Sequence, residues 1–223
     1  ETTRSGRHKN VPKEDVVILS AKRKGSINVS VKNELQFIEG EHYVVLDKPV
    51  ATRDSSKVEV VEMFSYGCPH CYEFEPLIKN WSKKQGNDVD FWFFPAVWNK
   101  PMKFLAQAFY TAQELHVAEK IHLPLFSKVV LEQQSVRNES DLANLFENYG
   151  VTREYFTQAF NSENVAQKVQ QAEQRVNNYK PVGVPEIVVN GKYRVGRMRA
   201  GGQAEMLAVV DFLVKKERAT LTK

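Results

Sequence analysis

The chain has 223 residues, of which 42% are hydrophobic, and its formal net charge is +4. This apolar content can form a packed core, so the composition excludes a wholly disordered protein. The longest apolar runs fall far short of the roughly 20 residues of a membrane-spanning helix. The basic excess is mild and not concentrated in one patch, which argues against nucleic-acid binding. We therefore expect a folded globular protein.

Residues 1–36 differ from the rest of the chain, because they hold eight basic residues against four acidic ones in their first 35 positions. Two short apolar runs at 15–20 and 26–31 flank a basic turn at 22–25, a pattern that predicts a β-hairpin. The first ten residues lack the apolar core of a secretory signal, so if the protein is exported we expect the sequence to be its mature form. The role of this extension is not assigned from the sequence.

Residues 37–99 predict a β-β-α-β order. A first strand is expected near 43–46, and a stronger one at 58–64 is rich in β-branched residues. A helix can continue over 72–84 with four large apolar side chains on one face, and 91–94 reads as a buried strand. The apolar helix face comprises Phe74, Leu77, Ile78 and Trp81.

Helical periodicity then dominates residues 100–179, and strands return after 180. Apolar side chains recur at helical spacing over 104–115, 142–149 and 165–179, which indicates packed helices. Residues 186–195 predict a hairpin whose turn is Asn190-Gly191. A last helix should bury one face, formed by Met206, Val209, Val210, Leu213 and Val214.

The chain contains two cysteines, Cys68 and Cys71, at the junction between the strand 58–64 and the following helix. Positions three apart on a helix share one face, so the pair can form a disulfide. At a helix start, unpaired N–H groups and the helix dipole stabilise the Cys68 thiolate. His70 adds a donor or a positive charge, Pro69 suits the first helical turn, and Cys71 should act as the shielded resolving thiol. This pattern indicates thiol-disulfide exchange.

Two other interpretations of the cysteine pair remain open. A Cys-x-x-Cys pair can be half of a zinc site, but the chain offers no second pair, and its other histidines are scattered. A purely structural disulfide would close a very small loop and stabilise little. We therefore expect neither a metal nor a cofactor.

The segment 64–75, Phe-Ser-Tyr-Gly-Cys-Pro-His-Cys-Tyr-Glu-Phe-Glu, resembles the active-site segment of the DsbA family of bacterial periplasmic disulfide oxidases. Gly183-Val-Pro185 and the Val-Asn-Gly-Lys-Tyr that follows at 189–193 resemble the family's cis-proline loop and hairpin, and 123–126 resembles part of its helical domain. The resemblance implies an α/β thioredoxin fold with an inserted all-helical domain. The thioredoxin-like domain would comprise 37–99 and 180–223, the insertion 100–179, and the N-terminal extension 1–36.

The resemblance also implies an activity and its partners. The protein would be an oxidase that introduces disulfide bonds into unfolded, cysteine-containing exported proteins through Cys68 and Cys71. A DsbB-like, quinone-linked membrane oxidase would reoxidise it. The expected location is the periplasm and the expected state is a monomer, with no nucleic-acid partner.

The family resemblance implies further site residues around the Cys-Pro-His-Cys motif. Pro185 would be cis and lie against Cys68, while Val184 would pair its backbone with an extended substrate segment. Gly183 and Tyr66 join the expected substrate-binding residues. Glu62 and Glu75 are candidates for tuning the cysteine pKa values, although Phe93 stands where the family often has a lysine partner for Glu62.

Two rival functions remain. The first is a reductase or isomerase of the same superfamily, which the measured redox potential and oligomeric state would distinguish. The second is a peptide-binding or chaperone module in which the disulfide is incidental. That module would keep its binding and its cellular function in a double Cys68, Cys71 mutant.

Overall fold

The computed structural model describes residues 2–5, 8–12, 37–132 and 136–221, and the chain divides into two units, 1–34 and 35–223. In the first unit, β1 (Thr2–Ser5) and β2 (His8–Pro12) pair antiparallel. The hairpin expected over 15–31 lies outside the described residues. The short, polar strands of 2–12 carry little of the apolar alternation from which strands are predicted.

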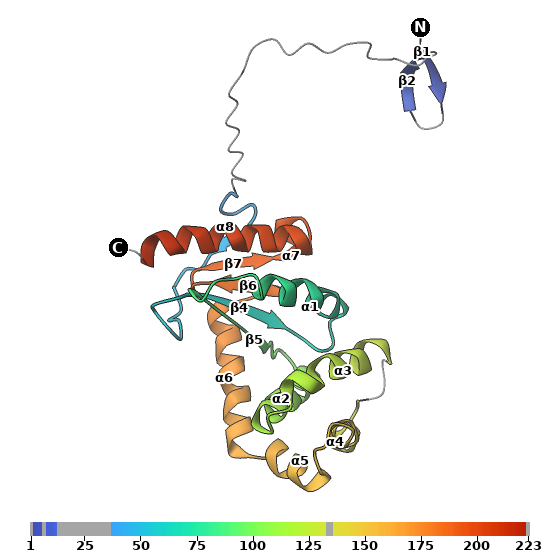
Figure 1. Ribbon diagram of the computed structural model, residues 1–223, viewed down its shortest axis with the longest axis vertical. Helices are drawn as coiled ribbons and strands as arrows, with labels where there is room; N and C mark the ends of the chain where they lie inside the picture. The colour runs from blue at the N-terminus through green and yellow to red at the C-terminus, as the bar shows by residue number, and fades with distance from the viewer. Residues whose placement is uncertain (1, 6–7, 13–36, 133–135, 222–223) are drawn as a thin grey trace. The chain divides into compact units, whose positions relative to one another are not determined.

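The second unit is built on a five-stranded mixed sheet of order β3-β7-β6-β4-β5 (Figure 1). Its central strand β4 pairs parallel with β5 and antiparallel with β6, and β7 pairs antiparallel with both β6 and β3. The parallel pair is joined by helix α1, as a crossover connection requires. The strands are β3 (Val44–Val45), β4 (Val58–Phe64), β5 (Val89–Pro95), β6 (Glu186–Val189) and β7 (Tyr193–Gly196).

Helices cover both faces of this sheet, and each face has its own core. Val58 and Val60 of β4 pack with α1 (Pro69–Ser82) and α8 (Gln203–Leu221), whereas Val61 and Met63 pack with the helices between β5 and β6. Because successive side chains of a strand point to opposite faces, one fully buried strand supplies both cores. β4 therefore packs against helices on both faces of the sheet, and this packing positions the loop that follows it.

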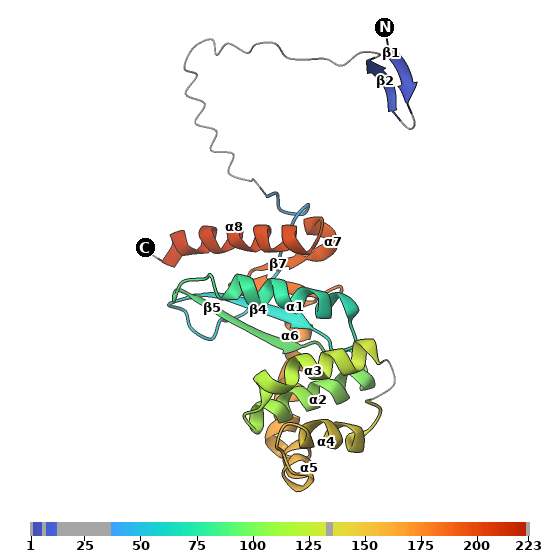
Figure 2. The same ribbon diagram turned by 45° about the vertical axis from the view of Figure 1, so that its right-hand side comes forward.

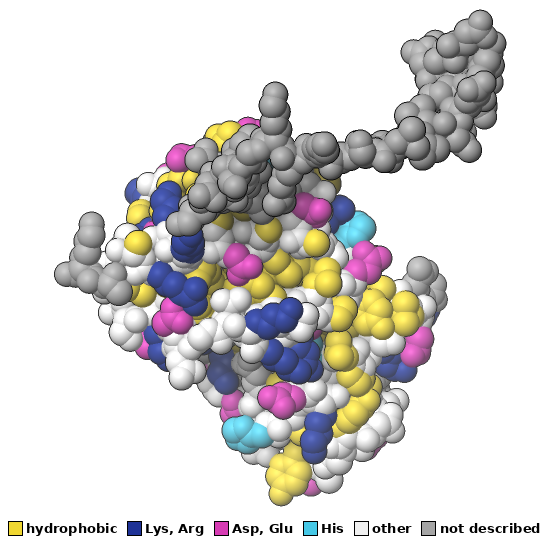
Figure 3. Space-filling view, turned by 45° about the horizontal axis from the view of Figure 1, so that its top comes forward, with side chains coloured by type: hydrophobic (Ala, Val, Ile, Leu, Met, Phe, Trp, Pro, Cys, Tyr) yellow, Lys and Arg dark blue, Asp and Glu magenta, His cyan; other side chains and the backbone are white. Residues whose placement is uncertain are grey.

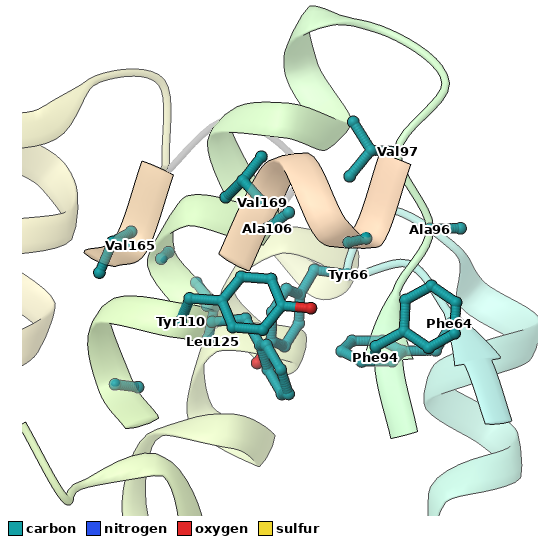
Figure 4. Packing of buried hydrophobic residues seen from close by; sticks show 14 of the residues in the cluster. Phe64, Tyr66, Phe94, Ala96, Val97, Ala106, Tyr110, Leu125, Val165 and Val169 are labelled. Atoms are coloured by element: carbon teal, nitrogen blue, oxygen red, sulfur yellow. The ribbon is translucent and has the colours of Figure 1, made fainter. Parts of the chain in front are cut away.

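Five consecutive helices separate β5 from β6, and they gather together in Figure 2. They lie where the sequence predicts the insertion, but the boundaries 37–99, 100–179 and 180–223 stay a prediction. Figure 4 shows Tyr110, Leu125, Val165 and Val169 packed among them, with Phe64 and Tyr66 close by. The helices are α2 (Lys100–Glu114), α3 (Ala118–Leu131), α4 (Glu139–Glu147), α5 (Arg153–Phe160) and α6 (Glu163–Tyr179).

The predicted hairpin at 186–195 is confirmed. Asn190 and Gly191 have φ values of 50° and 62°, the left-handed pair that a two-residue hairpin turn requires. A Cβ atom on Gly191 would lie 1.9 Å from the carbonyl oxygen of Val50, so glycine is also required by close backbone approach. The turn therefore fixes the register of β6, the strand that follows the Val184–Pro185 loop.

Some details differ from the predictions. β5 forms as expected, but as an edge strand it leaves Phe91–Phe93 only partly buried. Leu77 of α1, which was expected on the buried face, is exposed, whereas Glu75 of the same helix is buried. Short α7 (Arg197–Ala200) was not predicted as a separate helix, and neither were α3 and α5. Across the described residues, no helix combines the length and apolar character needed to cross a membrane.

Candidate active site

The two cysteines lie where buried β4 passes into α1. Cys68 is the N-cap of α1, with extended backbone (φ −102°, ψ 111°), and Pro69 occupies the first turn. Proline needs no N–H acceptor there, and its fixed φ suits the helix. The predicted strand-to-helix junction is confirmed. It places the Cys68 sulfur at the helix end where backbone N–H groups are unpaired.

The environment of Cys68 favours its thiolate. The Cys71 thiol donates a hydrogen bond to the Cys68 sulfur, and the backbone N–H groups of Cys71 and His70 add to this effect. These donors outweigh partial burial, so the pKa of Cys68 falls to about 6. The Cys68 Sγ lies 3.4 Å from the carbonyl oxygen of Val184, and the protonated thiol can donate a hydrogen bond to it.

Cys71 experiences the opposite environment. Its side chain is fully buried, and burial is the main cause that raises the pKa of its thiol well above the ordinary value. Hydrogen bonding to Cys68 and the charges of Cys68 and Glu62 raise it further. Neither cysteine is in a disulfide, so the site is described in its dithiol form. The Cys68 sulfur is thus partly exposed and the Cys71 sulfur buried, whereas their roles as nucleophile and resolving thiol stay a prediction.

His70 lies at the surface of the same turn. Its side chain is half exposed and its Nδ1 is 3.2 Å from Glu73 Oε2. His70 lowers the pKa of Cys68 mainly through its backbone N–H and less through the charge of its ring. The predicted influence of His70 on the thiolate is thus divided between backbone and side chain. Its backbone carbonyl accepts a hydrogen bond from Gln203 Nε2 at 2.7 Å, which ties α1 to the start of α8.

The loop 183–185 faces the cysteines from the sheet side. The Val184–Pro185 peptide bond is cis, as the resemblance implied, and the Val184 carbonyl oxygen lies within hydrogen-bond distance of the Cys68 thiol. Val182 N donates to Glu186 Oε1 at 3.3 Å, which anchors the loop to β6. Gly183 is partly exposed and has open space around its Cα. The loop therefore offers backbone polar groups beside the sulfur.

A buried acidic pair lies beneath the motif. Glu62 of β4 is opposite Phe93 of β5, which confirms the position of the residue that replaces the family's lysine. Burial, with a smaller effect from Glu75, raises the pKa of Glu62 well above its usual range. Among the described residues Glu62 Oε1 has no hydrogen-bond partner. Both carboxyl groups line a cavity of about 530 Å³ between α1, β5 and the helices α2 and α3.

The sequence analysis missed one member of this region, His122 of α3. Its Nδ1 is 2.8 Å from the Tyr66 hydroxyl, and its Nε2 is 3.0 Å from Glu75 Oε1. Its ring also packs edge-on against Phe64 and Phe126. The adjacent Leu-Pro-Leu-Phe segment at 123–126 could have pointed to His122, because the sequence analysis had already matched that segment to the family.

The Tyr66 side chain belongs to this buried network. It is only 2% exposed and packs against Phe126 with a ring separation of 4.7 Å. A role for Tyr66 in substrate binding stays a prediction, and the burial of its side chain does not support it. Among the described residues, no group of three or more metal-binding side chains is placed to hold an ion.

Comparison with known proteins places these features in a family. Residues 78–208 match the DSBA-like thioredoxin domain. The Thiol:disulfide interchange protein DsbA of Pseudomonas aeruginosa is 37% identical over 187 residues, which cover 84% of this chain and 89% of that protein. The protein of the same name from Pseudomonas syringae is 37% identical over 81% of this chain and 84% of its own length.

Solved structures give the same result. The crystal structure of Pseudomonas aeruginosa DsbA superposes with a TM-score of 0.80 and covers 84% of this chain and 97% of that one, at 37% identity. The oxidoreductase DsbA from Xylella fastidiosa superposes with a TM-score of 0.77 at 33% identity, over 83% of this chain and 99% of that one. Both solved structures therefore share the fold over more than four fifths of this chain.

Proposed function

Because this chain belongs to the DSBA-like thioredoxin family, whose relatives above are thiol:disulfide interchange proteins, we propose that Cys68 and Cys71 are the residues that perform its disulfide chemistry. The enzyme is a thiol:disulfide oxidoreductase that introduces disulfide bonds into proteins. The observation that carries the assignment is the opposite environment of two cysteines one helical turn apart. One thiol has a pKa of about 6, and the other is buried with a raised pKa.

The reaction begins from the Cys68–Cys71 disulfide. A substrate thiolate attacks the Cys68 sulfur, the Cys68–Cys71 bond breaks, and the Cys71 sulfur leaves and takes up a proton. A second substrate thiolate then attacks the substrate sulfur of the mixed disulfide and releases Cys68 as a thiolate. Two electrons pass from the substrate dithiol to the enzyme. The low pKa of Cys68 favours the last step, because a more acidic thiol is a better leaving group.

The raised pKa of Glu62 fits the need for a proton at Cys71. A carboxyl group with a raised pKa, close enough to act on the Cys71 thiol through its charge, is a suitable proton donor when Cys71 leaves. Phe93 cannot pair with this carboxyl group, so burial rather than an ion pair determines its protonation. Glu75 acts on the same centre through its charge.

The cis-proline loop supplies the docking site for the substrate. Backbone groups of Gly183 and Val184, beside the Cys68 sulfur, can hydrogen-bond an extended segment as an added strand. Large hydrophobic side chains remain exposed near this site, among them Val182 and Met198. On the face of the molecule drawn in Figure 3, hydrophobic side chains are exposed among charged and polar ones. Such a surface suits unfolded protein segments, whose apolar side chains are accessible.

Each turnover leaves a dithiol, which a second exchange must reoxidise. By family resemblance, the partner is a DsbB-like, quinone-linked membrane oxidase that docks on the same apolar surface. The substrates are then exported proteins with cysteines, and the working compartment is the bacterial periplasm, where disulfides persist. The enzyme needs no bound cofactor for this cycle, because the electrons are carried by its two sulfurs.

The first test compares two serine variants. Cys68→Ser should abolish oxidation of a dithiol peptide, because the attacked sulfur is gone. Cys71→Ser should also stop turnover but should trap a mixed disulfide between the peptide and Cys68, visible by mass spectrometry. Full peptide oxidation by Cys68→Ser, or trapping that does not require Cys68, would show that the assignment is wrong.

A further inference from the structure

A second cavity, of about 230 Å³, lies directly against the cis-proline loop. One wall is the loop itself, with Val184 and Pro185, and the other is the turn from β7 into α7. Two of its apolar side chains are largely open to solvent, since Val182 is 87% exposed and Met198 is 83% exposed. The cavity is therefore accessible from outside and bordered by apolar surface.

This cavity is next to the reacting sulfur. Val184 lines the cavity, and its carbonyl oxygen is 3.4 Å from Cys68 Sγ. Gln203, the first residue of α8, follows α7 after two glycines and donates to the backbone carbonyl of His70. The segment after β7 therefore contacts the active-site helix as well as lining the cavity.

The charge of the cavity is positive. Three arginines and one glutamate contribute to its lining. Arg194 is paired with buried Glu186, with Nε and Oε2 3.1 Å apart, so these two charges offset each other. Arg199 hydrogen-bonds the carbonyl oxygen of Gly40. For the side chain of Arg197, which is partly buried, the described part of the chain offers neither a hydrogen bond nor an ion pair.

We propose that this cavity binds an acidic side chain of the substrate, and that Arg197 is the residue that recognises it. The proposal rests on the proposed function, because it requires an extended segment docked on Val184. In such a segment, side chains on the same face recur every two residues, about 7 Å apart, and Val184 both contacts Cys68 and lines the cavity, so the next side chain on that face can reach it. A guanidinium beside apolar walls binds a carboxylate more strongly than one in open water.

The exchange reaction itself is unchanged by this recognition. The substrate cysteine still forms the mixed disulfide with Cys68, and the second substrate thiolate still releases it. The acidic side chain adds binding energy while the segment docks, and it exchanges no proton or electron. The preferred substrates are therefore segments with Asp or Glu two positions from the reacting cysteine.

The test uses the full chain and three dithiol peptides that differ at a single position. That position lies two residues from one cysteine and carries Glu, Gln or Lys. We expect kcat/KM to fall in the order Glu, Gln, Lys, with Glu over Lys by about fivefold at low salt, the scale of a partly exposed ion pair. In Arg197→Gln the ratio of Glu to Lys should approach one. Lys57→Gln removes the same charge from the end of β4 away from Cys68, and it should keep the preference.

The outcomes separate the two proposals. Equal kcat/KM for all three peptides with the unmodified enzyme overturns the acidic subsite but leaves the oxidase intact. An equal loss of preference in Lys57→Gln and Arg197→Gln also overturns it, because overall charge then explains the effect. If the enzyme oxidises none of the peptides, the proposed function itself fails.

Discussion

Cys68 and Cys71 carry the same side chain, yet the structure moves their pKa values in opposite directions. Cys68 has hydrogen-bond donors at a helix start, while Cys71 is one turn deeper in the core with Glu62 near it. The difference arises from position alone. In the proposed cycle the first sulfur is the one that the substrate attacks and the second is shielded. The same difference makes the reduced form favourable, because one thiolate is stabilised.

This difference predicts a pH dependence. The folded-state pKa of Cys68 is about 6, below its ordinary value, so the stabilisation is fully present above the unfolded pKa of ~8.5. It is lost as pH falls through about 6. Alkylation of the reduced protein by iodoacetamide should therefore rise with a midpoint near pH 6. Unfolding in urea should show that the reduced protein, compared with the oxidised one, gains stability between about pH 6 and ~8.5. An alkylation midpoint at the ordinary thiol pKa would contradict this account.

Glu62 presents a different residue-scale problem, because a buried carboxyl group faces Phe93 instead of a cation. An ionised carboxylate in that place would lack compensation, so burial raises the pKa of Glu62 well above its usual range. The folded protein therefore holds this proton to a higher pH than the unfolded chain does. Stability contributed by this site must fall as pH rises above the unfolded pKa of Glu62.

We expect Glu62→Gln to remove that fall. The variant should become more stable relative to the original protein as pH rises from 5 to 7, by up to about 1.4 kcal/mol per pH unit, measured by urea unfolding. Glu59→Gln on the same strand is the control. Glu59 Oε2 accepts from Arg53 N and Trp92 Nε1, so its substitution should lower stability. If the difference in unfolding free energy between Glu62→Gln and the original protein does not change with pH, the pKa of Glu62 is not raised.

At the scale of elements, His122 joins α3 to α1 and to the loop after β4. Its two ring nitrogens reach Glu75 and the Tyr66 hydroxyl, and its ring lies within an aromatic cluster. The helical insertion is therefore connected to the floor of the active site by directional contacts as well as by packing. These contacts position Glu75, the carboxylate that influences Glu62.

His122→Phe should keep the aromatic packing but remove both hydrogen bonds. Because Glu75 and Tyr66 are buried, we expect a loss of about 1–3 kcal/mol in the free energy of unfolding. A double-mutant cycle with Glu75→Gln should show a smaller effect of His122→Phe once the carboxylate is absent. Additive effects in that cycle would mean that the His122–Glu75 contact contributes nothing.

Local patterns predicted most of these elements. The β-branched run at 58–64 is β4 as expected, and Asn190-Gly191 forms the predicted turn. The network of Tyr66, His122 and Glu75 was not predictable in this way, because its members are 47 and 56 residues apart in the chain. A lone histidine shows no periodicity, and only the tertiary packing reveals its partners.

At the scale of the whole molecule, the site is assembled from three distant parts of the second unit. β4 and α1 bring the cysteines, the loop before β6 brings Val184 and Pro185, and the start of α8 brings Gln203. The cis state of Pro185 was expected from family resemblance, since spacing alone does not distinguish it from a trans proline. Arg197 was not expected at all, because its proximity to the loop depends on the path of α7.

The central claim is that the Cys68–Cys71 couple oxidises dithiols. Its redox equilibrium decides whether the protein oxidises or reduces its substrates. The measurement that tests it most directly is the equilibrium of Cys68 and Cys71 with glutathione redox buffers, followed by thiol trapping. We predict a reduction potential well above that of glutathione, because the Cys68 thiolate stabilises the reduced form. A potential below that of glutathione would contradict the account and identify the protein as a reductase.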